Sequence, residues 1–123
     1  MDPNLITGNI IDAAMKVHSA LGPGLLESAY EACLLHELHK RDMKAECQVT
    51  LPVRYDGIHI DLGYRVDLLV EDKVIVELKA VQTVHPIHAA QLLSYLKLSG
   101  NRLGLLINFN VLHLKEGIQR FVL

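Results

Sequence analysis

Residues 63–80 read GYRVDLLVEDKVIVELKA, two apolar runs separated by the charged pair Glu71-Asp72. Runs of aliphatic and β-branched residues on either side of a polar turn are typical of strands, so this segment predicts an antiparallel hairpin. Three charged residues, Asp67, Glu77 and Lys79, stand inside the runs. Because charged side chains are uncommon in strand interiors, these three are the first candidates for a functional site.

The turn of this hairpin decides whether the charged side chains meet. A two-residue turn at Glu71-Asp72 would pair Asp67 with Val76 and place the two acids on opposite faces. A three-residue loop that includes Lys73 would pair Asp67 with Glu77 instead. We predict the longer loop or a bulge, with both acids on one face.

Side chains alternate between the two faces of a strand. The first strand is therefore expected to place Val66, Leu68 and Val70 on one face, and Asp67 and Leu69 on the other. In the second strand, Ile75, Glu77 and Lys79 are expected to lie opposite to Val74, Val76 and Leu78. Each strand then has one apolar face and one mixed face.

Two carboxylates beside an ammonium group suit a hard divalent cation. Mg²⁺ prefers oxygen ligands, and a lysine beside it can orient a water molecule or offset the charge of a phosphate. Asp67, Glu77 and Lys79 therefore indicate phosphodiester hydrolysis. The alternative is a salt-bridge cluster on a solvent-exposed face of the sheet, because so short a pattern is common.

A helix is expected to begin near Gly24 and to run to about Arg41. One stripe of this helix carries Glu27, Tyr30, Leu34 and Leu38. A carboxylate at the head of an apolar stripe needs a partner, because an unpaired charge in a core is costly. The alternative is that Glu27 lies in the first turn, complements the helix dipole and stays exposed.

Residues 86–99 predict another helix, because proline occupies its first position and glycine follows its last. Gln91 and Tyr95 stand one turn apart and share a stripe with Ile87 and Leu98. Their polar groups are thus expected where apolar groups pack, and a buried amide requires hydrogen-bond partners. For Gln91 alone, an exposed helix edge is the alternative.

Four short patterns follow one another along the chain: Gly24-x-x-Glu27-x-x-Tyr30, Asp67, Glu77-x-Lys79 and Gln91-x-x-x-Tyr95. In this order they resemble the GxxExxY protein family, a branch of the PD-(D/E)xK nuclease-like superfamily. The resemblance covers essentially the whole chain. It implies an α/β (α+β) fold with a restriction-endonuclease-like core, in which a mixed central sheet with an antiparallel meander is flanked by helices.

The resemblance also implies roles for individual residues. Asp67 and Glu77 would bind Mg²⁺ or Mn²⁺, Glu27 would complete the metal shell, and Lys79 would position the attacking water. Gln91 and Tyr95 would support the site. The proline that sometimes precedes the strand aspartate in this superfamily is Val66 here.

The remaining segments predict the scaffold. Apolar residues recur at helical spacing over about residues 4–21, and this helix is expected to form an N-terminal helical hairpin with the next. Residues 45–55 and 58–62 alternate around Asp56-Gly57, a strong hairpin-turn signal, and residues 103–109 and 117–123 predict two further strands. With 123 residues, half of them apolar, we expect one nuclease-like domain over residues 1–123.

The formal net charge is −2. This balance argues against tight, non-specific binding of nucleic acid, because lysine and arginine supply most of that affinity by neutralising phosphates. A basic patch would need to gather Lys16, Lys40, Arg41, Lys44, Arg54 and Arg65 on one side of the folded chain. We therefore expect DNA binding to be weak or to depend on a partner.

Three functions remain open. The first is a Mg²⁺-dependent nuclease acting on DNA. The second is a nuclease-fold module that binds nucleic acid or a protein partner without cutting. The third is a structural subunit of a homo-oligomer, since the apolar fraction is high for so short a chain. The sequence lacks a long apolar run and a secretory signal, so we expect a cytoplasmic protein with no membrane contact.

Overall fold

The computed structural model describes the backbone of residues 1–123 and the side chains of residues 1–60 and 64–123. The helices are α1 (Pro3–Leu21), α2 (Glu27–Lys40) and α3 (Pro86–Ser99), with a short 3-10 helix, η1 (Leu114–Gly117). The strands are β1 (Ala45–Tyr55), β2 (Ile58–Val70), β3 (Val74–Lys79), β4 (Leu103–Asn108) and β5 (Ile118–Val122). The predicted order of helices and strands is confirmed, and residues 58–70 form one long strand.

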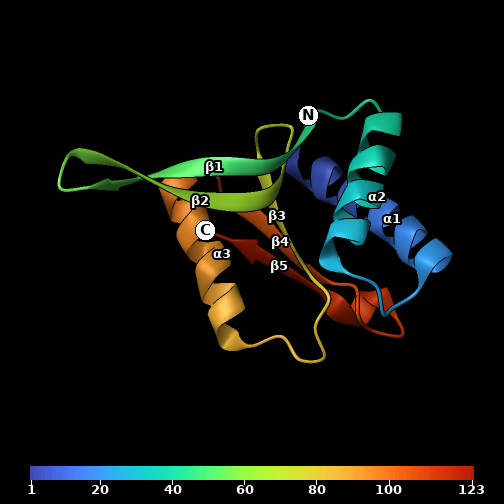
Figure 1. Cartoon of the computed structure of the whole chain (residues 1–123). Helices are drawn as coiled ribbons and strands as arrows, with labels where there is room; N and C mark the ends of the chain where they lie inside the picture. The colour runs from blue at the N-terminus through green and yellow to red at the C-terminus, as the bar shows by residue number, and fades with distance from the viewer.

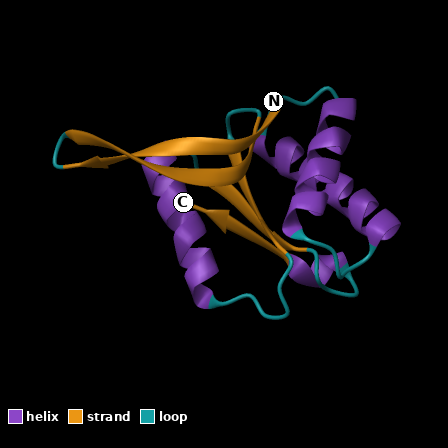
Figure 2. Ribbon diagram, in the orientation of Figure 1, coloured by secondary structure: helices purple, strands orange, loops and turns teal.

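The five strands form one sheet in the order β1-β2-β3-β4-β5. Strands β1 to β3 make the predicted antiparallel meander, β4 runs parallel to β3, and β5 is antiparallel to β4. A parallel pair requires a crossover connection, and α3 supplies it. The sheet is therefore mixed (Figure 2).

Helices cover both faces of the sheet, with α1 and α2 on one face and α3 on the other (Figure 1). Gly104 of β4 lets α3 approach closely, because a Cβ atom at this position would lie 3.0 Å from the side chain of Leu92. The outer part of the β1–β2 hairpin extends past α3 (Figure 1). In the part of the chain that the structure describes, no helix is long and apolar enough to cross a membrane.

The two central strands, β3 and β4, are covered on both faces, and this is why they are continuously apolar. Two buried polar side chains interrupt them: Glu77 on β3 is 7% exposed and Asn108 on β4 is 4% exposed, while Lys79 at the end of β3 is half-buried. Both lie toward the carboxyl ends of this parallel pair. The carboxyl ends of parallel strands are a frequent place for ligand sites in mixed α/β sheets.

The turn between β2 and β3 is the predicted three-residue loop. Val70 pairs with Val74, which leaves Glu71, Asp72 and Lys73 unpaired between the strands. Glu71 and Asp72 adopt left-handed conformations, with φ of 53° and 55°. If this pairing is continued along the strands away from the loop, Asp67 lies opposite Glu77.

The expected alternation of side chains along β2 is wrong on one side of Asp67. Leu68 and Val70 pack under α1 and α2 as one set, but Val66 packs with the α3 cluster on the other face. Opposite Asp67, Gln48 of β1 has a φ of 53°, and the ladder between Cys47–Leu68 and Val49–Val66 is interrupted there. Asp67 therefore stands at the point where β2 changes faces.

Charges near the helical hairpin are largely paired. Lys16 and Lys40 contact Glu37, Arg41 contacts Asp12, and Lys44 contacts Asp72 and Glu46. Four of the six residues that were considered for a basic patch are thus held by neighbouring acids. This part of the surface offers nucleic acid little uncompensated positive charge.

Candidate active site

Asp67 on β2 and Glu77 on β3 lie side by side, and two hydrogen bonds hold their carboxylates in place. The backbone N–H of Asp67 donates a hydrogen bond to Oε1 of Glu77 at 3.1 Å. The backbone N–H of Leu78 donates in return to Oδ2 of Asp67 at 2.8 Å. These reciprocal bonds fix the two carboxylates next to each other, as the three-residue loop predicts.

The two acids are electrostatically unfavourable without a counterion. Burial, and after it the charge of Asp67, raise the pKa of Glu77 to about 8. Among the side chains that the structure describes, no ion pair involves either acid. A buried carboxylate beside a second one is stable only when it holds a proton or a cation.

A small cavity of about 160 Å³ opens beside Asp67, toward the start of α2. Its lining consists of Glu27, Ser28, Glu31, Gln48, Asp67 and Leu78. The amide of Gln48 donates to Oε1 of Glu31 at 2.7 Å and to Oδ1 of Asp67 at 3.4 Å. Gln48 thus bridges two acids that would otherwise repel each other across the cavity.

Glu31 and Gln48 were not identified from the sequence. Glu31 follows Glu27 by one helical turn, and this i, i+4 spacing was a signal that could have revealed it. Partial burial raises the pKa of Glu31, as do the charges of Asp67 and Glu27, while the hydrogen bond from Gln48 lowers it. Gln48 gave no sequence signal, because its position depends on its left-handed backbone.

Glu27 is exposed, so its predicted direction into the core is wrong and the dipole alternative describes it better. Tyr30, Leu34 and Leu38 are buried as predicted. Glu27 is the first residue of α2, one turn before Tyr30, and the core does not cover this end of the helix. Glu27 nevertheless lines the same cavity as Asp67. The structure therefore brings it to the rim of the acidic cluster.

Tyr30 explains much of the Gly24-x-x-Glu27-x-x-Tyr30 pattern. Its hydroxyl donates to the carbonyl of Gly22 at 2.6 Å and accepts from the N–H of Leu25 at 3.1 Å. Gly24 supplies the left-handed conformation, with φ of 100°, that the loop needs before the helix. The tyrosine therefore ties the loop to α2 and sets where Glu27 begins the helix.

Lys79 lies two residues after Glu77 and so on the same face of β3. It is half-buried, and its positive charge acts against the burial that raises the pKa of Glu77. Partial burial lowers the pKa of His88 in α3, and Lys79 acts in the same direction while Glu27 opposes it. His88 thus lies within electrostatic range of both Lys79 and Glu27 at the edge of the site.

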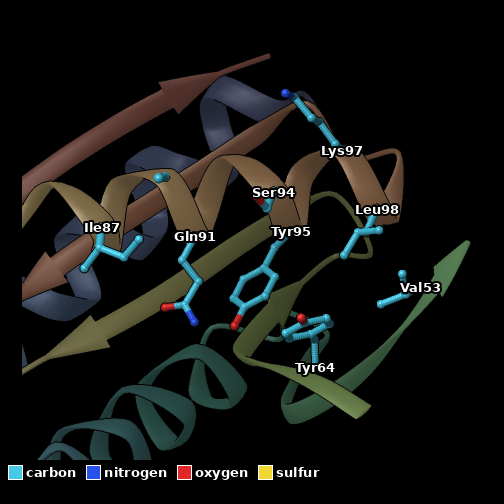
Figure 3. Close-up of a pocket in the computed structure, with 9 residues that line it drawn as sticks. Val53, Tyr64, Ile87, Gln91, Ser94, Tyr95, Lys97 and Leu98 are labelled. Atoms are coloured by element: carbon cyan, nitrogen blue, oxygen red, sulfur yellow. The ribbon is translucent and has the colours of Figure 1, made fainter. Parts of the chain in front are cut away.

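Tyr95 and Gln91 differ in their environments. Tyr95 is buried, and burial followed by the charges of Glu77 and Asp67 raises its pKa. Gln91 is exposed, as is Ile87, so the prediction of a buried amide is wrong and the exposed helix edge is correct. The side chains of Gln91 and Tyr95 extend from the same side of α3 toward Tyr64 (Figure 3).

The donor set fits a hard cation. Within the described residues, no three or more His, Cys, Asp or Glu side chains are already grouped as a metal site. Proteins commonly hold Mg²⁺ through one or two carboxylates together with water and phosphate oxygens. Asp67 and the buried Glu77, whose pKa is raised by burial and then by the charge of Asp67, provide such a pair, with the acids of α2 nearby.

Comparison with known proteins places the chain in a family. The family model for the PD-(D/E)XK nuclease superfamily matches residues 4–121. No curated protein and no solved structure matches the chain. The helices and the mixed sheet have the restriction-endonuclease-like arrangement expected for this superfamily. The chain therefore belongs to the PD-(D/E)XK nuclease superfamily.

Proposed function

We propose that this protein hydrolyses phosphodiester bonds of DNA with the help of Mg²⁺ or Mn²⁺. The observation that supports this most strongly is the buried Glu77 carboxylate, held against Asp67 with Lys79 two residues further along the strand. A bound divalent cation would polarise the phosphate and lower the pKa of a water molecule. The proposal also places the chain in the GxxExxY branch of the superfamily.

In this proposal Asp67 and Glu77 hold the cation. Lys79, on the same face of β3, positions the attacking water and offsets charge that develops on the phosphate. Glu27 and Glu31 line the adjoining cavity and would bind the cation through water or directly. Gln91 and Tyr95 support the site from α3, with Tyr95 close enough to respond to the charges of both strand acids.

The pairing of surface charges supports weak or partner-dependent binding of DNA. The basic residues near the helical hairpin are held by acids, so few are free to release counterions from a duplex. A small nuclease of this kind would rely on the cation and on a local groove for most of its affinity. A second protein that supplies a basic surface would increase it.

One observation favours a second candidate, a nuclease-fold module that binds without cutting. Both carboxylate oxygens of Asp67 already accept hydrogen bonds, one from Leu78 and one from Gln48. A cation that bound Asp67 would have to displace the amide of Gln48 from this acid. If that displacement is unfavourable, the site holds metal weakly and turnover is lost.

The test is a nuclease assay with matched variants. The purified protein is incubated with linear, circular and single-stranded DNA and with RNA, in Mg²⁺, in Mn²⁺ and in EDTA. Wild-type protein should cleave DNA only with a metal, and D67N, E77Q and K79M should each reduce the rate by about 100-fold or more. D72N is the control, because it removes one acid from the adjacent exposed loop.

Two results would decide between the candidates. Cleavage that survives in D67N, E77Q and K79M would come from a contaminant and would remove the support for a nuclease. No cleavage by the wild-type protein, together with metal-independent binding of nucleic acid, would favour the non-cutting module.

A further inference from the structure

A second, larger cavity lies on the α3 side of the molecule, between α3 and the β1–β2 hairpin. Its volume is about 710 Å³. The lining residues, shown in Figure 3, are Val53, Tyr64, Ile87, Ala90, Gln91, Ser94, Tyr95, Lys97 and Leu98. We call this cavity the tyrosine groove. Apart from Gln91 and Tyr95, its residues have no part in the proposed hydrolysis.

Two aromatic rings form the centre of the tyrosine groove. The ring centroids of Tyr64 and Tyr95 are 6.0 Å apart and their planes are inclined by 52°. Tyr64 is 46% exposed, whereas Tyr95 is 6% exposed and held by the core. A half-exposed ring braced by a buried one offers a flat apolar face to a ligand. Gln91 and Ser94 add hydrogen-bonding groups at the wall.

The charge around the tyrosine groove is different from that of the whole chain. The chain has a formal net charge of −2, yet residues 80–115 contain no aspartate or glutamate. Among the lining residues whose side chains the structure describes, none is acidic, and Lys97 lies at the edge of the groove. The adjoining cavity shares Lys97 and adds Arg54, and its described lining residues include no acid. This surface therefore suits a ligand that combines apolar rings with negative charge.

The tyrosine groove also connects to the carboxylate cluster. Tyr95 packs in the same cluster of side chains as Val66 and Ile75. Val66 precedes Asp67 along β2, and Ile75 lies two residues before Glu77 on β3. A ligand in the groove would thus lie next to the strands that carry the two acids.

We propose that the tyrosine groove binds an unpaired nucleobase, stacked on the exposed face of Tyr64 that Tyr95 braces, while the phosphate backbone passes Lys97 and Arg54. The inference rests on the proposed function, which it makes more specific: the substrate would be single-stranded, or unpaired at its end, near the acids. Bases within a duplex have both faces covered by their neighbours, whereas unpaired bases readily stack on aromatic side chains. Stacking tolerates any base, so sequence preference should be weak.

The test measures binding separately from cleavage. E77Q protein in EDTA is titrated, by fluorescence anisotropy, into labelled single-stranded DNA and RNA of about twelve nucleotides and into a blunt duplex. Single strands should bind more tightly than the duplex. A strand that carries 2-aminopurine should lose fluorescence on binding if its base stacks on a tyrosine.

Variants of Tyr64 give the decisive comparison, since this half-exposed residue can be changed with little effect on folding. Y64A should weaken single-strand binding by about tenfold, in line with the loss of one stacked base. Y64F keeps the ring and should bind like the parent, while Y64L keeps apolar bulk without a flat face and should behave like Y64A. Y55A is the matched control, because Tyr55 is an exposed tyrosine of the same hairpin outside the groove.

Several outcomes would overturn the inference. Equal binding by Y64A and Y55A would exclude stacking in the tyrosine groove, even if the wild-type protein cleaves DNA. A concentration-dependent dimer that Y64A disrupts, with no change in nucleic-acid binding, would assign the groove to self-association. Conversely, Y64-dependent binding in a protein that never cleaves would support the groove and refute the proposed hydrolysis.

Discussion

Glu77 and Asn108 are both buried polar residues on the central strands, but their surroundings are opposite. The amide of Asn108 donates to the carbonyl of Val81 at 2.9 Å, and its oxygen accepts from the N–H groups of Val81 and Asn110 at 3.1 and 3.2 Å. Glu77 accepts one bond from the backbone of Asp67, whose own carboxylate lies beside it. Asn108 has partners of complementary polarity, whereas Glu77 faces a charge of the same sign.

The difference separates a structural polar residue from one that is suited to bind a ligand. Neutral hydrogen bonds to otherwise buried backbone groups stabilise the end of β3 and the segment after it. Two like charges in the same layer repel each other, and a bound cation would relieve this repulsion. Stability and metal binding should therefore respond in opposite ways to changes at the two positions.

The largest stability effect is expected from pH. Burial, and after it the charge of Asp67, raise the pKa of Glu77 from its ordinary value of 4.5 to about 8, so folding favours the protonated acid. This contribution is fully present below about pH 4.5 and is lost as the pH rises toward 8, with a cost of roughly 2 to 5 kcal/mol. Denaturant unfolding of metal-free protein at several pH values measures it.

The control for this prediction is E77Q, which has no acid to titrate at this position. The variant should lack this part of the pH dependence and should be more stable than the metal-free wild-type protein at pH 8. Mg²⁺ at pH 8 should stabilise the wild-type protein and leave E77Q unchanged. Identical pH profiles for both proteins would show that Glu77 is not under the predicted repulsion.

A smaller loss of stability is expected from a change at Asn108, whose side chain is hydrogen-bonded to the backbone. N108A leaves the backbone groups of Val81 without their side-chain partner and should lower the free energy of unfolding by about 2 kcal/mol, with little dependence on pH. Metal binding should persist in the folded variant. If N108A kept full stability but no longer bound metal, Asn108 would be a ligand-binding residue and not a structural one, which would contradict the comparison with Glu77.

The sequence predicted those features that local rules control. The bounds of α3 follow from Pro86 and Gly100, while the three-residue β2–β3 loop was predicted from the assumption that Asp67 and Glu77 share one site. Features that depend on tertiary geometry were missed. Val66 packs on the other face of the sheet from Leu68, and the exposure of Glu27 and Gln91 depends on which part and which side of each helix the sheet covers.

The same distinction applies to the site. The strand acids and Lys79 were recognisable because charges stand out in apolar strands. Gln48 lies on an exposed surface, where polar residues are ordinary, and Glu31 is marked only by its spacing of one helical turn from Glu27. Only the folded chain brings them to the cavity beside Asp67.

The most direct test of the central claim is calorimetric titration of Mn²⁺ into metal-free protein at pH 8, without nucleic acid. If Asp67 and Glu77 form a cation site, the wild-type protein and N108A should bind the metal, and E77Q and D67N should bind it much more weakly or not at all. Equal binding by all four proteins, or no binding by any of them, would contradict the claim that this carboxylate pair holds a divalent cation.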